Sequence, residues 1–538
     1  MKKKITLLAI SIFFKTLVLA QAQLSQVWQA DNGDGTYKNP IIHANYSDPD
    51  VIRVGEDYFM VSSSFNCTPM IPILHSKDLV NWTIVNYVQT QQQPAEVFAK
   101  PQHGGGVWAS AIRYHKGEFY IFYPDPDFGI YRTKTKDPFG EWETPILVKA
   151  AKGWIDPCPL WDEDGKAYLV HGFAGSRAGY KSILAINRMD TEGSKLLDDG
   201  VVIFDGHAAH PTVEGPKIYK RNGFYYVFAP AGGVPTGWQL VLRSKNIYGP
   251  YDEKIVLAQG KTPFNGPHQG AWVDTPTGED WFIHFQDKGA YGRVVLLQPM
   301  VWKNDFPVMG DDPNNIGTGS PVFYHKKPNV GKTYPKATPQ ESDEFDSPKL
   351  GLQWQWHANS VAGWAFPYPA KGALRMNAVL MPDSFRNMWD VPNLLLQKLP
   401  AEEFTATTKL TFTPRTEGEQ VGLIMMGLDY SFIALQNQGG KLAITQTTCM
   451  DADKKSKETM TPSTFIDKNT VYLRIKVQKN AYCTFSYSLD GKNFTTVGKE
   501  FKAREGKWIG AKMGLFCSRT QKFNDAGVAD IDWFRVEK

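Results

Sequence analysis

A short sequence pattern recurs five times and constrains the fold more than any other feature of the chain. In each copy, a turn containing glycine precedes aromatic, strand-type residues. Successive copies are 62, 48, 58 and 55 residues apart, and their glycines are Gly55, Gly117, Gly165, Gly223 and Gly278. Repeats of this length, built from short strands, predict a β-propeller with one blade per copy.

A polar, ionisable or aromatic residue stands seven to ten positions before each glycine. These residues are Asp48, Trp108, Asp156, Glu214 and His268. Residues at the same position in each sequence repeat occupy the same position in each blade, and the first strand of each propeller blade lines the central channel. We therefore expect the five side chains to converge on one funnel. Carboxylates paired in a funnel indicate general acid and base catalysis on a sugar.

The chain after the repeats has a different character. Residues 325–340 are rich in proline and lysine, which is typical of a linker. Strand-like runs follow, and Asp490-Gly491 marks a hairpin turn between two of them. Helical periodicity is nearly absent, so the sequence predicts an all-β protein. We expect a five-bladed propeller over residues 23–324 and a β-sandwich of two packed sheets over residues 341–538.

Residues 1–22 have the features of a secretory signal peptide. Three lysines precede a mostly apolar run that ends in Ala20-Gln-Ala22, a suitable cleavage site. Lys15 interrupts the run, which argues against a transmembrane anchor. We expect no membrane insertion after signal removal. The predicted location is periplasmic or secreted.

Charge and cysteine content exclude several classes of function. Without residues 1–22 the chain has 55 basic and 55 acidic residues, so no basic excess indicates a nucleic-acid partner. Five cysteines are present without a Cys-x-x-Cys pair, so a zinc site is not expected. An odd number in an exported chain leaves at least one thiol free.

Several motifs of the first half resemble the opening of glycoside hydrolase family 43. They are Asn39-Pro-Ile-Ile, Ser47-Asp-Pro-Asp-Val-Ile, Tyr58-Phe-Met-Val-Ser-Ser-Ser-Phe65 and His75-Ser-Lys-Asp-Leu79. The resemblance covers nearly all of residues 39–310. It implies a five-bladed propeller enzyme acting as a β-xylosidase, α-L-arabinofuranosidase or arabinanase. The second half resembles the concanavalin-like, jelly-roll sandwich attached to many xylosidase-like members.

The resemblance implies roles for the three carboxylates. Asp48 matches the general base of the family and Glu214 matches its general acid. Asp156 matches the carboxylate that orients the acid and raises its pKa. The family hydrolyses glycosidic bonds with inversion, which requires one ionised and one protonated carboxyl group. A neighbouring negative charge raises the pKa of an acid, which gives Asp156 a physical use.

The resemblance also implies substrate-binding residues and allows an ion. Phe65, Trp108, His268 and Arg293 match family residues that surround the sugar. No cofactor is required for the chemistry, but a structural Ca²⁺ is implied either near His268 or in the second domain. There, oxygen-rich clusters at 342–346 and 529–533 suit Ca²⁺, and Glu344 and Asp532 are the candidate ligands.

Two departures from the xylosidase pattern bear on the substrate. After Phe65 the chain reads Asn66-Cys-Thr-Pro-Met70, and the second blade reads Trp108-Ala-Ser-Ala. On this ground we expect an exo-acting α-L-arabinofuranosidase of plant polysaccharides, with β-D-xylosidase as the alternative. A propeller fructosidase is disfavoured because its opening motif is absent. A non-catalytic carbohydrate-binding propeller is disfavoured because it needs no such trio of acids.

Overall fold

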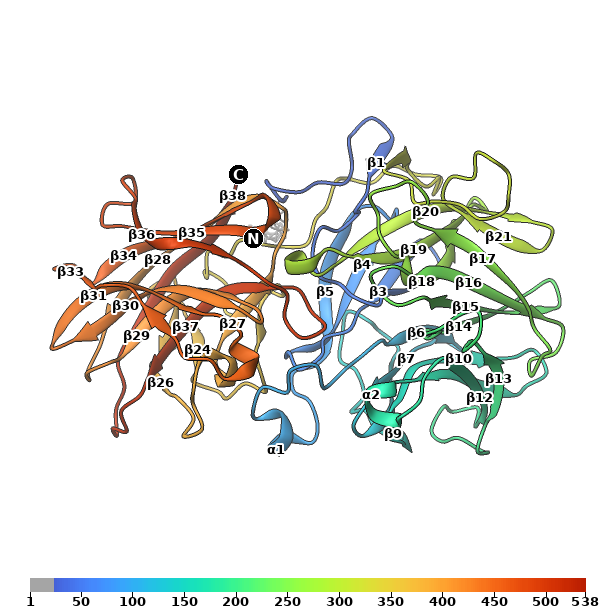
Figure 1. The fold of residues 1–538 in the computed structure, drawn as a ribbon, viewed down its shortest axis with the longest axis horizontal. Helices are drawn as coiled ribbons and strands as arrows, with labels where there is room; N and C mark the ends of the chain where they lie inside the picture. The colour runs from blue at the N-terminus through green and yellow to red at the C-terminus, as the bar shows by residue number, and fades with distance from the viewer. Residues whose placement is uncertain (1–23) are drawn as a thin grey trace, which may run out of the picture.

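The computed structural model describes residues 24–538 and consists of two β-rich parts (Figure 1). The expected signal peptide, residues 1–22, lies outside the described residues. Propeller strands run from blue to yellow-green in Figure 1, and sandwich strands are orange to red. Among the described residues, no helix is long and apolar enough to cross a membrane.

The first part contains five four-stranded antiparallel sheets, each formed by consecutive strands. This confirms the predicted propeller. Blade 1 contains β2 (Asp50–Val54), β3 (Asp57–Val61), β4 (Met70–Ser76) and β5 (Trp82–Gln89), and blade 2 contains β6 (Ala111–His115), β7 (Glu118–Asp125), β8 (Gly129–Thr135) and β9 (Ile146–Ala150). Blade 3 contains β10 (Trp154–Trp161), β11 (Ala167–Phe173), β12 (Ile183–Met189) and β13 (Val201–Asp205), and blade 4 contains β14 (Lys217–Arg221), β15 (Phe224–Ala231), β16 (Trp238–Ser244) and β17 (Asp252–Ala258). Blade 5 contains β18 (His268–Asp274), β19 (Asp280–Asp287), β20 (Arg293–Lys303) and β21 (Phe306–Met309).

The recurring glycine forms the hairpin between the first and second strands of each blade. All five glycines have positive φ, from 64° to 88°. Only glycine adopts this conformation without steric cost, which explains its recurrence at this place. First strands of neighbouring blades contact one another, since β2 packs between β18 and β6, and β10 between β6 and β14. They therefore form the inner ring, as the phase of the repeats predicts.

The segment before the first blade closes this ring. Strand β1 (Thr36–Lys38) pairs with β22 (Tyr324–Lys326), which follows the last blade. The Asn39 amide donates to the carbonyl oxygens of Leu297 and Val322 at 2.8 and 2.9 Å. These bonds attach the start of blade 1 to blade 5.

The second part is a sandwich of a nine-stranded and a seven-stranded sheet, which confirms the predicted class. Alternate residues of β34, from Val471 to Val477, are buried between the sheets. The nine-stranded sheet contains β23 (Gln355–Trp356), β26 (Val379–Leu380), β27 (Leu395–Lys398), β29 (Gln420–Met426), β30 (Tyr430–Gln438), β31 (Lys441–Cys449), β32 (Thr459–Met460), β33 (Thr464–Ile466) and β37 (Lys512–Arg519). The other contains β24 (Ala365–Tyr368), β25 (Ala373–Asn377), β28 (Phe404–Thr413), β34 (Thr470–Gln478), β35 (Tyr482–Ser488), β36 (Thr495–Lys502) and β38 (Val528–Glu537).

Within residues 24–538, helical structure is confined to short turns. They are α1 (Ala95–Phe98), α2 (Gly175–Ala178) and the 3₁₀ turns η1 (Gly289–Tyr291), η2 (Met388–Asp390), η3 (Ala452–Lys454) and η4 (Lys479–Ala481).

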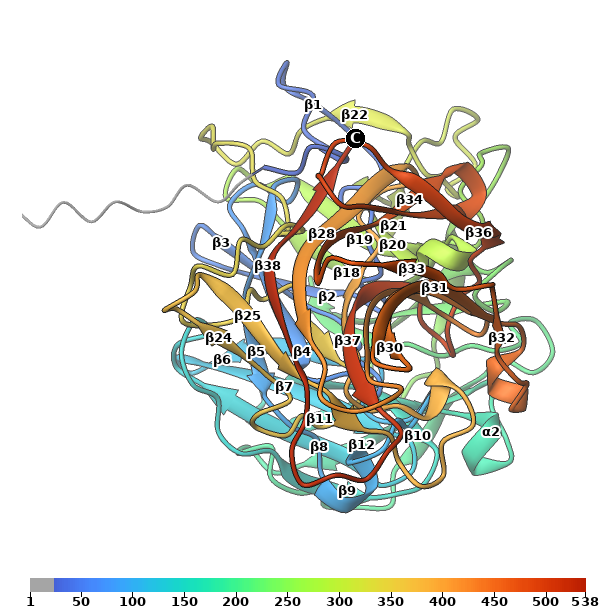
Figure 2. The same ribbon diagram turned by 90° about the vertical axis from the view of Figure 1, so that its left-hand side faces the viewer.

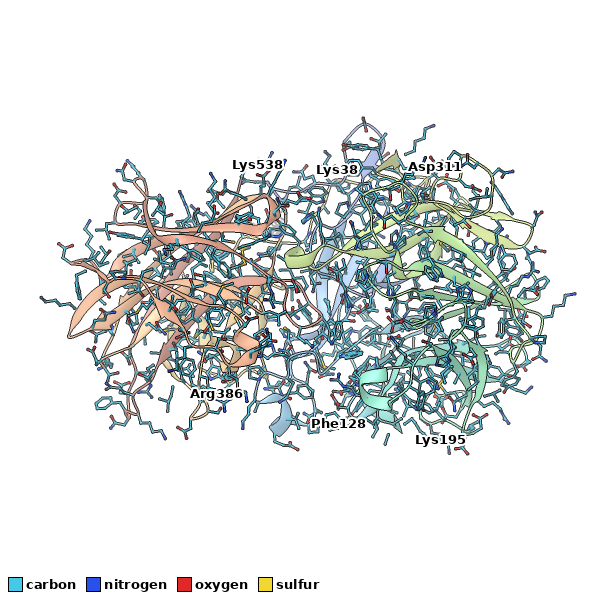
Figure 3. The ribbon with its side chains drawn as sticks, in the orientation of Figure 1. Lys38, Phe128, Lys195, Asp311, Arg386 and Lys538 are labelled. Atoms are coloured by element: carbon cyan, nitrogen blue, oxygen red, sulfur yellow. The ribbon has the colours of Figure 1, made fainter. Side chains whose placement is uncertain are left out.

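The sandwich packs against the propeller (Figure 2), and side chains of both parts fill the region between them (Figure 3). Backbone hydrogen bonds join the two parts at several places, including contacts at Thr68 and at Ala511. At the first contact, the backbone groups of Thr68 and Trp356 exchange hydrogen bonds of 3.1 and 2.6 Å. At the second, the N–H of Ala511 donates to the carbonyl oxygen of Ala290 at 2.7 Å. A Cβ on Gly292 would approach the Gly510 nitrogen to 2.7 Å, so this contact requires glycine.

Candidate active site

The three carboxylates lie at the same end of the inner ring, where the first strands begin. Asp48 precedes β2, Glu214 precedes β14, and Asp156 lies in β10 at a register shift. Asp48 and Asp156 both have positive φ, 56° and 57°, an uncommon conformation for residues other than glycine. Such backbone strain is concentrated at functional sites. All three side chains line one pocket of about 450 Å³.

Asp48 is surrounded by hydrogen-bond donors. The hydroxyls of Ser63 and Ser47 donate to its Oδ2 at 2.6 and 3.0 Å. The Arg293 guanidinium donates to its Oδ1 at 3.1 Å. An ionised carboxylate only accepts hydrogen bonds, so this arrangement suits the ionised form that a general base requires.

Glu214 is held in the opposite protonation state. Burial raises its pKa to about 8, and the negative charge of Asp156 adds to the rise. Asp156 itself is buried, and its Oδ2 accepts the Gly215 N–H at 2.8 Å. Burial and the charge of Asp48 raise the pKa of Asp156 to about 6. At neutral pH Glu214 is therefore protonated and able to donate a proton, as a general acid must.

Replacing Asp156 with Asn should shift the pH profile of activity. The amide removes a negative charge that favours the protonated form of Glu214, so the pKa of Glu214 falls. Activity needs protonated Glu214, and we therefore expect the alkaline limb of kcat against pH to move to lower pH. Steady-state rates across the pH range measure this limb. An unmoved limb would mean that Asp156 acts only in structure.

His268 and Arg293 also line the pocket, in agreement with the sequence analysis. His268 is buried, and its Nε2 lies 3.4 Å from Glu214 Oε1. Burial lowers the pKa of His268 to about 3, so this contact joins a neutral imidazole to a protonated carboxyl group. Neither ring nitrogen has a hydrogen-bond partner among the described residues. A Ca²⁺ near His268 stays a prediction.

Aromatic residues form the walls of the pocket. Phe65 and Trp108 come from the propeller, and their ring centroids are 6.3 Å apart. Two others are Phe173 of the propeller and Trp508, which belongs to the sandwich and lies on the loop between β36 and β37. Trp508 lines the pocket and is nevertheless 45% exposed to solvent. The sequence analysis missed Trp508 because it considered only residues in phase with the propeller repeat or matched by the family's propeller motifs.

The two candidate calcium ligands in the sandwich contact cations of the protein. Glu344 accepts two hydrogen bonds from Arg535, at 2.7 and 2.8 Å, and Asp532 pairs with Lys409. Within residues 24–538, no three acidic, His or Cys side chains are grouped so that they could hold a metal ion. A calcium ion bound by Glu344 and Asp532 remains a prediction.

Comparison with known proteins agrees with this geometry. The sequence profile of "Glycosyl hydrolases family 43" matches residues 37–307, and that of "Beta xylosidase C-terminal Concanavalin A-like domain" matches residues 342–537. The fold and the site together define a glycosidase, an enzyme that hydrolyses glycosyl bonds. The chain belongs to glycoside hydrolase family 43.

Individual relatives span nearly the whole chain. A "putative beta-xylosidase" of Xylanibacter ruminicola is 39% identical over 91% of this chain and 88% of its own. A "beta-xylosidase" of Formosa agariphila is 33% identical over 96% and 93%. A "non-reducing end alpha-L-arabinofuranosidase" of Bacteroides ovatus is 26% identical over 93% and 94%. The crystal structure of BlXynB from Bacillus licheniformis, a family 43 protein, superposes with a TM-score of 0.79, at 25% identity over 93% and 99%.

Proposed function

We propose that this protein is an exported, exo-acting and inverting β-D-xylosidase that removes terminal xylosyl residues from xylo-oligosaccharides. The observation that carries the proposal is the pocket itself. It contains a protonated carboxyl group, Glu214, and an all-donor environment around a second carboxylate, Asp48. Trp508 of the sandwich adds a wall to it, which suits a chain end better than the middle of a polymer.

Two observations favour xylose over the arabinofuranose that the sequence analysis preferred. Two relatives above 30% identity bear the names "putative beta-xylosidase" and "beta-xylosidase". Moreover, the residues after Phe65 that depart from the xylosidase pattern do not line the pocket. The Asn66 amide donates to the His357 carbonyl at 2.7 Å, and the Thr68 hydroxyl donates to the Ala358 carbonyl at 2.7 Å. These residues bind the sandwich, so they say little about the sugar.

α-L-Arabinofuranosidase activity is the second candidate. The relative from Bacteroides ovatus bears that name and matches this chain over nearly its full length. The two sugars present similar hydroxyl patterns to one pocket, so activity on both is compatible with the site.

Two aryl glycosides test the proposal directly. We expect kcat/KM for nitrophenyl β-D-xylopyranoside to exceed that for nitrophenyl α-L-arabinofuranoside at least roughly 10-fold. Inversion requires the carboxyl groups of Asp48 and Glu214 to stand about 6.5–9.5 Å apart with water between them. The first product seen by NMR should then be α-xylose. A preference for the arabinofuranoside would select the second candidate, and β-xylose as first product would refute inversion.

Trp508 offers a test of the chain-end pocket. We expect Trp508→Ala to raise KM for xylobiose roughly 5- to 10-fold and to change kcat less, because an aromatic contact contributes about 1 kcal/mol. Initial rates over a range of xylobiose concentrations measure both constants. Phe523→Ala is the control, since Phe523 is a similarly exposed aromatic residue of the sandwich that does not line the pocket. Equal constants in the two variants would contradict a role for Trp508 in binding.

A further inference from the structure

A cysteine of the propeller and a lysine of the sandwich meet inside the contact between the two parts. Cys67 follows the pocket residue Phe65, and Lys512 begins β37, just after the loop that carries Trp508. The Lys512 Nζ lies 3.0 Å from the Cys67 Sγ. Both residues are buried, with 1% and 4% of their surfaces exposed. The thiol and the amine are therefore in direct contact, shielded from bulk solvent.

The surroundings of this pair are rich in positive charge. Lys398 lies beside it, and the Gln355 Oε1 accepts hydrogen bonds from both Lys398 and Lys512, at 3.0 and 3.1 Å. Burial, and then repulsion from Lys512, lower the pKa of Lys398 to about 7. Two lysine amines that share one amide oxygen repel each other when both are charged, which contributes to the lowered pKa of Lys398.

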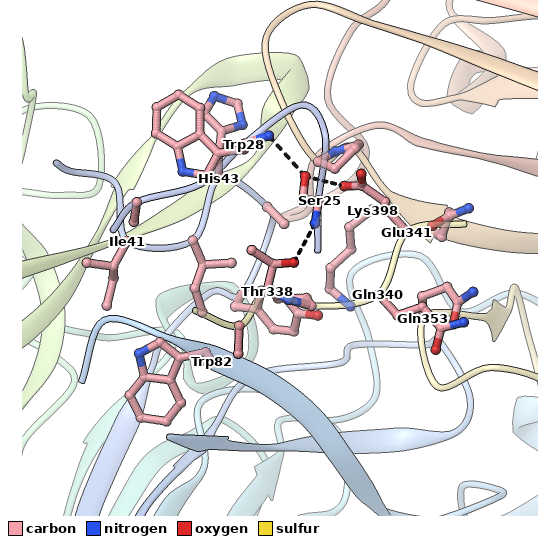
Figure 4. A pocket seen from close by; sticks show the side chains of 18 of the residues that line it. Ser25, Trp28, Ile41, His43, Trp82, Thr338, Gln340, Glu341, Gln353 and Lys398 are labelled. Carbon is pink, nitrogen blue, oxygen red and sulfur yellow. Dashed lines mark hydrogen bonds between the residues drawn. The ribbon is translucent and has the colours of Figure 1, made fainter. Parts of the chain in front are cut away.

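A small cavity reaches Lys398, the neighbour of the pair, although neither Cys67 nor Lys512 lines it. Its volume is about 50 Å³, and Lys398 and Tyr46 line it (Figure 4). The Gln353 Oε1 and Gln397 Nε2 also belong to its lining residues and have no hydrogen-bond partner among the described residues. A cavity of this size, with these two unpartnered polar atoms, accommodates molecules as small as water or hydrogen peroxide.

We propose that Cys67 and Lys512 form a modification site at which peroxide creates a covalent nitrogen–oxygen–sulfur cross-link. In the first step the Cys67 thiol is oxidised by one hydrogen peroxide to a sulfenic acid, and one water is released. In the second step the sulfenic oxygen becomes bonded to the Lys512 nitrogen. A second peroxide accepts the two electrons, and two further waters are formed from its oxygens and the departing hydrogens. The 3.0 Å separation is too long for a direct bond and suits one bridging oxygen.

The cross-link would join two walls of the substrate pocket. It connects the loop after Phe65 to the strand after Trp508 and closes a loop of 445 residues. A covalent link across so long a loop restricts the unfolded chain, so we expect Tm to rise after peroxide treatment and to return after a thiol reductant. The inference concerns the contact between the two parts and does not depend on which pentose the enzyme releases.

Peptide mapping of the full chain tests the proposal. The enzyme is treated with a small excess of hydrogen peroxide, digested without reductant and analysed by mass spectrometry. We expect one linked pair of peptides, containing Cys67 and Lys512, with the mass of both plus one oxygen and minus two hydrogens. Dithiothreitol should separate the pair. Cys67 found unmodified, oxidised without a link, or linked without the extra oxygen would overturn the proposal.

The chain contains its own matched comparison. The buried Cys158 Sγ lies 2.8 Å from the Arg113 guanidinium, a cation that does not act as a nucleophile. We expect no link at this pair in the same digest. Lys512→Arg keeps the positive charge and should abolish the link and the rise in Tm, and Cys67→Ser should do the same. Each variant is first compared with the parent by circular dichroism, so that a folding defect is recognised. A rise in Tm that persists in folded Cys67→Ser would contradict the assignment.

Discussion

Glu214→Gln is expected to lower kcat on xylobiose at least about 100-fold, because the amide cannot protonate the leaving sugar. The loss should be much smaller on a dinitrophenyl xyloside, whose leaving group departs without a proton. Steady-state kinetics on the two substrates measure this difference. Glu163→Gln is the control, since Glu163 is an exposed residue of a blade-3 turn that does not line the pocket. A similar loss on both substrates would contradict the role of Glu214 as general acid.

Glu214→Gln should also retain the fold, and the pH dependence of its stability tests the raised pKa of Glu214. Burial raises the pKa of Glu214 from 4.5 to about 8, so the folded state holds this proton more tightly than the unfolded state. The contribution of Glu214 to the free energy of unfolding therefore falls as pH rises from 4.5 towards 8 and stays low above it. Gln has no such dependence. We expect Glu214→Gln to unfold at the same or a higher temperature than the parent at pH 8.

The sequence predicted the inner ring of the propeller well because one local rule governs each blade. A hairpin with positive φ needs glycine, as at Gly55 and Gly223, and the number of residues from that turn to the channel end of the strand is nearly constant. Residues in equal phase, such as Asp48 and Glu214, must then meet. This reasoning requires no knowledge of long-range packing, and it placed the carboxylates, Trp108 and His268 in one pocket.

Contacts between the propeller and the sandwich were not predicted, because they join segments that are distant in sequence and follow no local rule. Trp508 is distant in sequence from the other pocket residues, and no repeat relates the loop of the sandwich to the propeller. The bonds of Asn66 and Thr68 to the segment after β23 are equally non-local. From the sequence, Asn66–Met70 resembled a change at the rim of the pocket, and together with Trp108-Ala-Ser-Ala it led to the preference for arabinofuranose. In the structure, Asn66 and Thr68 donate hydrogen bonds to the sandwich, and this contact accounts for the two residues without reference to the sugar.

Asp48→Asn should remove activity with a different pattern from Glu214→Gln. Water must be deprotonated whichever group leaves, so we expect kcat to fall at least about 100-fold on both xylobiose and the dinitrophenyl xyloside. The Asn oxygen can still accept a hydrogen bond from Ser63 or Arg293, which now bond to the Asp48 carboxylate, so the local structure should persist. The same two-substrate kinetics measure the loss, and thermal unfolding checks the fold. Asp164→Asn, at an aspartate paired with Lys166 on the surface of blade 3, should leave both rates unchanged.

The pair of variants separates the two roles in a way that neither does alone. Loss confined to the poor leaving group identifies an acid, and loss on both substrates identifies a base or a group that positions water. Ser63→Ala extends the comparison, because it removes the 2.6 Å hydrogen bond to Asp48 and keeps the carboxylate. We expect a partial loss in Ser63→Ala on both substrates, smaller than that of Asp48→Asn. Near-normal turnover of Asp48→Asn on either substrate would show that another group activates water, and the assignment of Asp48 as the base would fail even if the enzyme proved to be a xylosidase.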